Sequence, residues 1–331
     1  MWMSETIVVL VNGEVLADGG GPTIPDQREN ANRLASGLLS LLMSDLKIAI
    51  LHGNKPQVGF VLLRSEIASH ILHTIPLDVC GADTQGATGY MLSQAIMNLM
   101  REQGGKRNVI SMVTQTLVQN TLANEHETLK TIGPWYDRGK AETYRQARDW
   151  IMLEEPGRGY RRAVPSLPPL EILEIQGIRQ LVDTGSIVIA AGGGGIPVVR
   201  NSSGKLEGIE AVVQTEDVAC ILSQQLNAKI LLMIIEADDK FTLSRLSTEN
   251  LNHLSLEELD NLIEKESISS SSVRAKLEAA SRFLHLGGEQ VIVTTLRKLS
   301  QALDKQNGLR IGSLDPSVEM FRIPGLATER K

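Results

Sequence analysis

Four consecutive glycines, Gly192 to Gly195, follow the apolar run Ile187 to Ala191, and Pro197 closes the turn. Because glycine has no side chain, the N–H groups of such a turn can approach a ligand closely. In an α/β protein, a bare turn after a strand is where an anionic group binds. A tight turn with positive φ would need only one glycine, so the tetraglycine segment favours an anion-binding loop.

Two other apolar runs also end in turns of glycine and small polar residues, at Val11 to Glu14 and at Gly53 to Gly59. The carboxyl ends of parallel strands meet at one rim of a sheet, so we expect the three turns to form a cradle for an oxyanion. Phosphoryl transfer needs positioning and positive charge more than covalent help. Lys55, Lys130 and Lys276 are the candidates for that charge.

Several motifs that are typical of other enzyme classes are absent from the sequence. The sequence has no P-loop, no Gly-x-Ser-x-Gly elbow and no Gly-x-Gly-x-x-Gly after the first strand. Its six histidines show no zinc-ligand spacing. We interpret Cys80 and Cys220 as buried thiols rather than a disulfide or a metal site.

The composition is that of an ordinary soluble domain, with 331 residues, 42% hydrophobic and 22% charged. A net charge of −6 without a basic run, and 3% aromatic residues, argue against nucleic acid as a partner. No apolar stretch reaches the roughly 18 residues of a membrane span, and no signal peptide is evident. We therefore expect a cytoplasmic protein that does not bind membranes.

The elements that position these turns alternate between strands and helices, which predicts an α/β fold with crossovers and a mostly parallel sheet. Residues 118–168 break the alternation and are predicted to form an inserted subdomain or lid. Ser255 and Glu258 form the pattern of a capping box. Strands are expected at 6–10, 47–51, 109–114, 187–191, 230–235, 290–294 and 309–312, and helices at 27–46, 58–69, 84–102, 171–184, 217–226 and 273–286.

Several motifs, in order along the chain, resemble those of the carbamate kinase family. His52-Gly-Asn-Lys-Pro-Gln-Val-Gly59 is similar to the family's His-Gly-Asn-Gly-Pro-Gln-Val-Gly loop, and Lys130-Thr-Ile-Gly-Pro-Trp-Tyr136 to its Lys-Pro-Ile-Gly-Pro-Phe-Tyr. Further matches are at 76–82, 85–90, 159–166, 191–199, 227–228, 276–280 and 287–288. The resemblance extends from about Ile7 to Ile311.

The resemblance implies the amino-acid-kinase fold, a three-layer αβα sandwich around a mostly parallel sheet, with a small protruding subdomain. Residues 1–331 would form a single domain, with a carbamate and phosphate lobe at 1–200, a lid at 118–168 and a nucleotide lobe at 201–331. The implied protein is a homodimer that transfers a phosphoryl group between carbamoyl phosphate and ADP, or between ATP and carbamate in reverse, with Mg²⁺. Its setting would be arginine or purine (allantoin) catabolism, which can include complexes with other catabolic enzymes.

The resemblance also assigns residues to roles, and no protein-bound metal site is among them. The catalytic groups would be Lys130, Lys276, Glu216 and Asp217. The residues that bind the small anion would be Asn12, Gly13, Gly53, Asn54, Lys55, Gly192, Gly193, Gly194 and Gly195. The nucleotide-binding residues would be Glu236, Ala237, Phe241, Ser272 and Lys276.

The chain departs from the family's pattern at the catalytic positions. The first turn reads Val11-Asn-Gly13 instead of Gly-Gly-Asn, which would bring a branched side chain to the phosphoryl group. The family's Asp-Lys-Asp-Leu-Ala, with its catalytic lysine and aspartate, falls at Gln214-Thr-Glu-Asp-Val218. Without a gap, Thr215 replaces the lysine and Glu216 the aspartate. A shift of one residue restores Asp217 but puts Glu216 at the lysine, so that lysine is absent in both alignments.

Loss of one preorganised charge donor typically costs about 3–4 kcal/mol of transition-state stabilisation. Lys55, at a position where the family has glycine, is a candidate to compensate from the neighbouring loop. Three hypotheses follow. The chain is a carbamate kinase-type phosphotransferase, a catalytically inactive homologue that binds a ligand or joins a complex, or a kinase for another small acid, because fold does not fix function.

Overall fold

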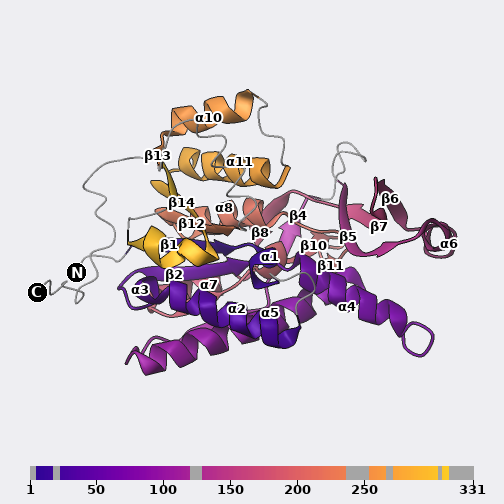
Figure 1. The fold of residues 1–331 in the computed structure, drawn as a ribbon, viewed down its shortest axis with the longest axis horizontal. Coiled ribbons are helices and arrows are strands. Elements are labelled where there is room, and N and C mark those ends of the chain that lie inside the picture. The colour runs from indigo at the N-terminus through magenta and orange to yellow at the C-terminus, as the bar shows by residue number, and fades with distance from the viewer. Residues whose placement is uncertain are drawn as a thin grey trace, which may run out of the picture.

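The fold is built on one eight-stranded sheet. A computed structural model of the chain describes residues 5–17, 23–119, 129–235, 253–265, 271–304 and 308–312. The strand order is β13-β15-β14-β12-β1-β2-β9-β3, and every pair is parallel except β14 with β15 (Figure 1). The strands are β1 (Thr6–Val11), β2 (Lys47–His52), β3 (Val109–Ser111), β9 (Ile187–Ile189), β12 (Ile230–Ile235), β13 (His253–Leu254), β14 (Gln290–Thr295) and β15 (Leu309–Gly312).

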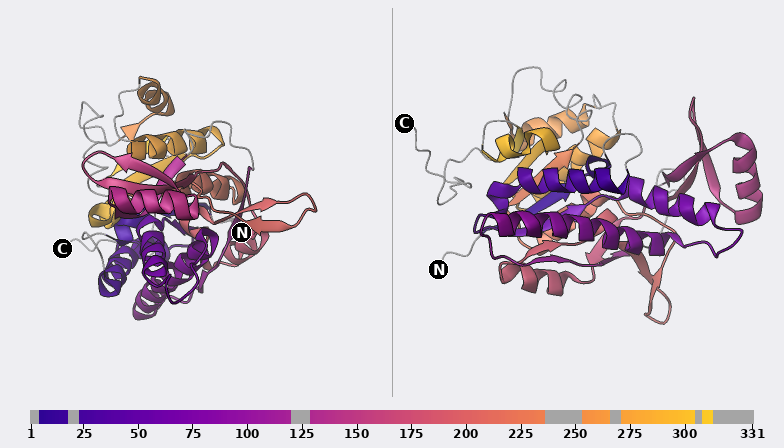
Figure 2. Two further views of the ribbon diagram at one scale, coloured as in Figure 1. Left: turned by 90° about the vertical axis from the view of Figure 1, so that its right-hand side faces the viewer. Right: turned by 60° about the horizontal axis from the view of Figure 1, so that its bottom comes forward.

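Helices cover both faces of this sheet (Figure 2). Side chains alternate along β1, so that Ile7 and Val9 pack into one core and Val8 and Leu10 into the other. The first core contains side chains of α2 (Ile24–Gly37), α3 (Leu39–Leu42), α5 (Leu77–Glu102) and α12 (Leu299–Leu303). The second contains side chains of α7 (Ile175–Asp183), α8 (Thr215–Gln225), α10 (Leu256–Glu264) and α11 (Ser271–His285). The predicted three-layer αβα sandwich is confirmed.

Several predicted helices have boundaries that differ from expectation. Helix α5 begins at Leu77, seven residues before the predicted start, so the glycines of this segment lie within the helix and not in a turn. A Cβ on Gly89 would lie 1.9 Å from the Ser111 side chain, so the glycine lets α5 approach β3. The helix expected at 171–184 begins only at Ile175, because 169–172 form strand β8. The helix expected at 27–46 is divided into α2 and α3 at Leu38.

Two smaller sheets extend the molecule. Strand β4 (Gln115–Val118) lies between β8 (Pro169–Ile172) and β10 (Ile196–Arg200), and β11 (Leu206–Gly208) completes this four-stranded sheet. A three-stranded sheet of β5 (Leu129–Tyr136), β7 (Gly159–Pro165) and β6 (Ile151–Glu155) projects beyond the main sheet together with α6 (Arg138–Arg148) (Figure 1). The protruding subdomain therefore exists, and its described part is 129–165.

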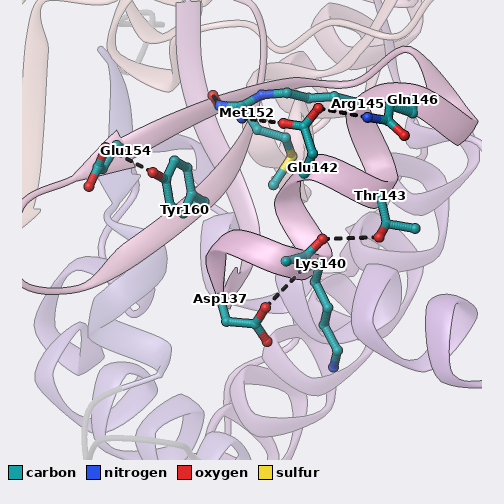
Figure 3. A network of polar contacts seen from close by, with 10 residues as sticks. Asp137, Lys140, Glu142, Thr143, Arg145, Gln146, Met152, Glu154 and Tyr160 are labelled. Carbon is teal, nitrogen blue, oxygen red and sulfur yellow. Dashed lines mark hydrogen bonds and ion pairs between the residues drawn. The ribbon is translucent and has the colours of Figure 1, made fainter.

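The protruding subdomain has a polar network of its own (Figure 3) and a small core. Asp137 caps α6 by accepting from the Lys140 backbone N–H at 2.9 Å. Arg145 of α6 donates to the Met152 carbonyl oxygen at 2.7 Å, which joins the helix to β6. Tyr136, Ala141 and Met152 are buried beneath this network. These contacts and the pairing of β5 with β7 position Lys130, which lies on β5.

Candidate functional site

A cavity of about 290 Å³ lies at the carboxyl ends of β1 and β2. The turns that follow these strands form one wall, β5 of the protruding subdomain forms a second, and the N-terminal turns of α8 and α11 form a third. The cavity brings together the predicted site residues Asn12, Gly13, Gly53, Asn54, Lys55, Lys130, Gly193, Glu216, Ser272 and Lys276. Segments from the whole length of the chain thus meet at the edge where ligands were expected.

The first two turns touch each other through bare backbone. A Cβ on Gly53 would lie 2.5 Å from the Gly13 nitrogen, and a Cβ on Gly13 would lie 2.8 Å from the Gly53 carbonyl carbon. The Gly53 N–H donates to the Val11 carbonyl oxygen at 2.8 Å. The Val11 side chain is fully buried in the core, so our expectation that it would face the phosphoryl group is wrong. Strand β1 ends at Val11, and the backbone of Gly13 and Gly53 forms the rim of the cavity, as predicted.

The tetraglycine segment contributes to the cavity through one residue. A Cβ on Gly193 would lie 2.2 Å from the Asn54 amide, so the third turn abuts the second. The N–H groups of Gly194 and Gly195 donate within the turn, to Ala191 O at 2.9 Å and Gly192 O at 3.1 Å. Those two glycines therefore shape the turn, and their N–H groups are already engaged.

The remaining glycine of the segment, Gly192, does not line the cavity. A Cβ on it would lie 2.5 Å from the ring of His52, which is buried. Burial lowers the pKa of His52 to about 4, so the ring is neutral at pH 7 and its Nδ1 donates to the Gly53 carbonyl oxygen at 3.0 Å. His52 thus supports two of the turns from below.

A chain of buried hydrogen bonds from α5 fixes the tetraglycine turn, and the sequence analysis assigned it no role. The Gln85 amide pairs with Thr114, donating to its carbonyl oxygen at 3.0 Å and accepting from its N–H at 2.8 Å. The Thr114 hydroxyl accepts from the Ala191 N–H at 2.7 Å, which holds Ala191 at φ 53°. Gln85 belongs to a block that matches the family, and this was the only signal available for it.

Lys276 is the most enclosed charge of the site, with 3% of its surface exposed. Its Nζ donates to the Ser272 hydroxyl at 2.6 Å and lies 3.9 Å from a Glu216 carboxylate oxygen. Lys276 and Glu216 therefore lie as an ion pair at the cavity wall.

The structure also shows which acidic residue of α8 faces the cavity. Glu216 lines it beside Thr215, whereas Asp217 is paired with Arg282 at 2.6 Å and does not line it. This arrangement favours the alignment without a gap, in which Glu216 stands at the family's aspartate and Thr215 at its lysine. Asp217 is thus not brought to the predicted site.

Lys55 and Lys130 add positive charge opposite α8. Among the residues that the structure describes, neither lysine has an ion-pair partner. With Lys276, three lysines and two glutamates, Glu14 and Glu216, line the cavity. This balance favours an anionic ligand.

The described residues leave part of the predicted nucleotide site open. Glu236, Ala237 and Phe241 lie outside them, and Ser272 and Lys276 line the cavity. Cys80 and Cys220 are buried free thiols, as predicted. None of the described helices is both long and apolar enough to cross a membrane.

Comparisons with known proteins identify the family of the chain. The model of the amino acid kinase family matches residues 5–295. The carbamate kinase of Pyrococcus horikoshii is 34% identical over 314 residues, which cover 93% of this chain and 99% of that protein. The chain belongs to the carbamate kinase family. The carbamate kinase-like protein YahI of Escherichia coli, another relative, is 34% identical over 315 residues, with 93% and 99% covered.

A solved structure of the family shows the same fold. The carbamate kinase from Giardia lamblia bound to AMP-PNP has a TM-score of 0.84 and 30% sequence identity, and the match covers 94% of this chain and 99% of that one. The amino-acid-kinase fold predicted from the sequence is therefore confirmed.

Proposed function

We propose that this member of the carbamate kinase family transfers a phosphoryl group between carbamoyl phosphate and ADP. The observation that carries the proposal is the meeting of Lys130, Lys276 and the bare rim of Gly13 and Gly53 in one cavity. Backbone without side chains admits a phosphoryl group, and the lysines offset its charge. The AMP-PNP in the Giardia lamblia structure supports a nucleotide as the second substrate.

In the direction of ATP formation, an oxygen of the terminal phosphate of ADP attacks the phosphorus of carbamoyl phosphate. The bond from that phosphorus to the carbamoyl oxygen breaks, and carbamate leaves with the electron pair. Lys130 and Lys276 stabilise the charge on the equatorial oxygens of the transferred group. Glu216 acts as a positioning residue, since its carboxylate lies 3.9 Å from the Lys276 ammonium.

Mg²⁺ belongs to the same proposal, and the donor set of the cavity fits a nucleotide-borne ion. Within the described ranges, no group of three His, Cys, Asp or Glu side chains is arranged to hold a metal. Mg²⁺ is usually bound through one or two carboxylates and substrate phosphates, and Glu14 and Glu216 are the carboxylates of this cavity. When bound, the ion neutralises phosphate charge.

The lysine that the family has at position 215 needs a replacement, and Lys55 is the available cation. Lys55 is exposed, is the first residue of α4 (Lys55–Ile67), and lines the 290 Å³ cavity, which we call the reaction cavity. We propose that Lys55 supplies part of the positive charge that this family lysine would provide.

A second candidate function is a non-catalytic homologue that binds the anion or serves in a complex. Thr215 at the cavity wall favours it, because threonine supplies no charge to a transition state. The two candidates share the anion-binding rim and differ in turnover.

A coupled assay for ATP formation from carbamoyl phosphate and MgADP tests the proposal, with calorimetry of MgADP binding beside it. The proposal predicts turnover that requires Lys130. Nucleotide binding without turnover would favour the non-catalytic candidate, and absence of both would remove the kinase.

Assembly and setting are part of the proposal too. We assign the chain to a homodimer, supported by exposed apolar side chains at the end of α4 and just after it, where Ile67, Ile71 and Leu72 are 66%, 76% and 61% exposed. The proposed setting is cytoplasmic arginine or purine catabolism, alone or in a complex with other catabolic enzymes. Light scattering of the wild type and of Ile71→Asp tests the dimer.

A further inference from the structure

Asn54 occupies the N-cap position of α4 but does not cap the helix. Asparagine is among the best capping residues, because its side-chain oxygen usually accepts from an N–H of the first turn. Here the Asn54 backbone has φ −143° and ψ 12°, outside the extended region of an ordinary N-cap, and its side chain makes no cap hydrogen bond. Asn54 instead lines the reaction cavity. Its side chain is therefore placed for a ligand and not for the helix.

Thr84 of α5 fixes the orientation of the Asn54 amide. Thr84 is buried, and its hydroxyl donates its proton to the Gly81 carbonyl oxygen at 2.9 Å. With that proton engaged, the hydroxyl can only accept from Asn54, and the Asn54 Nδ2 donates to it at 2.8 Å. The nitrogen of the amide is thereby held toward α5, and Oδ1 is left on the other edge of the amide.

The tetraglycine turn covers one face of the same amide. A Cβ on Gly193 would lie 2.2 Å from Asn54 Nδ2 and 2.3 Å from Asn54 Oδ1, so the amide lies flat against bare backbone. Its hydrogen bonds therefore form along the edge of the plane, where Thr84 engages the nitrogen. Within the part of the chain that the structure describes, no group donates to Asn54 Oδ1. An acceptor is thus available at the rim of the reaction cavity.

We propose that Thr84 is a positioning residue that makes the reaction cavity select acyl phosphates with an NH₂ group on the acyl carbon. This inference rests on the proposed function and deepens it. Carbamoyl phosphate carries an NH₂ group where acetyl phosphate carries a methyl group of similar size. The NH₂ group donates to Asn54 Oδ1, whereas the methyl group would remove water from this oxygen without replacing the hydrogen bond. A site that pairs with a substrate N–H rejects the analogue without it more strongly than an apolar pocket does.

The two acyl phosphates undergo the same bond changes, so a comparison of their rates isolates the group beside Asn54. With either one, an oxygen of the terminal phosphate of ADP attacks the phosphorus, and the bond from phosphorus to the acyl oxygen breaks. Carbamate or acetate leaves with the electron pair. In Thr84→Val, which keeps the shape of the side chain, the amide is no longer held, and either of its ends can face the substrate. Selectivity should then fall.

The ratio of kcat/KM for carbamoyl phosphate to kcat/KM for acetyl phosphate, each with MgADP, tests the proposal. The wild type should favour carbamoyl phosphate by about 10²-fold or more, and Thr84→Val should lower this ratio about tenfold. Thr84→Ser, which keeps the hydroxyl, should have the wild-type ratio. The matched control is Thr88→Val, the same substitution one turn further along α5, at a buried hydroxyl without a partner among the described residues. It should leave the ratio unchanged.

Asn54→Leu is a second variant, which keeps the test decisive if Thr84→Val does not fold. It removes the acceptor in a side chain of similar shape. The reaction of carbamoyl phosphate should therefore slow by about tenfold or more, and that of acetyl phosphate much less. Equal ratios in the wild type and in these variants would overturn the proposal. A Thr84→Ser ratio as low as that of Thr84→Val would overturn the role of the hydroxyl.

Calorimetry with two analogues that cannot transfer a phosphoryl group separates this inference from the proposed function. Phosphonoacetamide carries the NH₂ group, and acetonylphosphonate carries a methyl group in its place. The wild type should bind phosphonoacetamide about tenfold or more tightly than acetonylphosphonate, and Thr84→Val should reduce that preference. Absence of ATP formation would remove the proposed function and leave this preference to decide the inference. Equal affinity for the two analogues, or no saturable binding of either, would overturn the inference with or without turnover.

Discussion

The two sides of the reaction cavity differ in what lines them: backbone on one side and side chains on the other. The rim at the ends of β1 and β2 is backbone against backbone, with Gly13 and Gly53 too close for any side chain. The opposite wall consists of side chains on α8 and α11, where Glu216 and Lys276 lie 3.9 Å apart. The rim tolerates one residue type, whereas the wall depends on which charges are present and how they pair. Departures from the family's pattern at the rim and at the wall therefore have different consequences.

The largest expected effect is on the side-chain wall. Replacement of Lys276 by Met removes a preorganised cation and leaves Glu216 without its counter-charge, so kcat for ATP formation should fall by about 10² to 10³. Steady-state kinetics of the purified variant measure it. Lys229→Met is the control, because Lys229 pairs with Glu289 on the surface and should keep wild-type kcat. Unchanged kcat in Lys276→Met would mean that the wall has no part in transfer.

The rim should show a strong pH dependence of stability through His52. Its folded-state pKa is about 4 because of burial, below the ordinary value of 6.5, so the unfolded chain binds the proton more tightly. The contribution of this residue to stability is complete above pH 6.5 and is lost as pH falls toward 4, by about 3 kcal/mol.

Denaturant unfolding between pH 7 and 4 measures this loss against His52→Gln, which should flatten the curve. His73→Gln, at an exposed histidine, should keep the full slope. Parallel curves for the wild type and His52→Gln would show that the ring beneath the rim is not the neutral one described.

Gly53→Ala tests the rim itself. The added Cβ would lie 2.5 Å from the Gly13 nitrogen, so the two turns must separate. A displacement of about 1 Å at a reacting centre can cost about 10² in rate, and kcat/KM should fall by that order. Gly86→Ala is the matched control, since a Cβ there meets nothing within 4 Å. Equal kinetics in both variants would refute the close contact of the turns.

A smaller effect on kcat/KM is expected for Lys55, which follows the Gly53-Asn54 turn of the rim and is proposed to replace a cation of the opposite wall. Lys55→Gly restores the family's residue and should lower kcat/KM about tenfold, less than Lys276→Met because Lys55 is exposed and better screened. Thr215→Lys in the same variant should recover most of the loss. No recovery in the double variant would contradict the compensation between the two positions.

The smallest effect is expected for Asp217. Its pair with Arg282 is partly exposed, so Asp217→Asn should change the free energy of unfolding by less than about 1 kcal/mol and kcat by less than about twofold. Glu216→Gln should be the more damaging of the two. The reverse order in a side-by-side kinetic comparison would restore the shifted alignment, with Asp217 as the acidic residue of the site.

The difference between the two sides also explains what the sequence could predict. Runs of glycine after apolar strands identify a rim, because Gly13 and Gly53 lie against each other's backbone and Gly193 lies against the Asn54 side chain. The alternating strands and helices likewise predicted the layers and the parallel sheet. Side-chain pairing carries no such local signal: Glu216 and Asp217 are neighbours in sequence, and only the orientation of α8 shows which one faces Lys276. The Gln85 to Thr114 contact joins residues far apart in the chain and was invisible for the same reason.

The most direct test of the central claim is a ³¹P NMR time course of carbamoyl phosphate with MgADP and the wild-type chain, beside Lys130→Met. The two proteins share the bare rim, and only the wild type has all three lysines of the cavity. The account predicts that the γ-phosphate resonance of ATP grows as carbamoyl phosphate disappears in the wild-type sample, and grows far more slowly in the variant. Conversion of carbamoyl phosphate to inorganic phosphate alone, at the same rate in both samples, would contradict it.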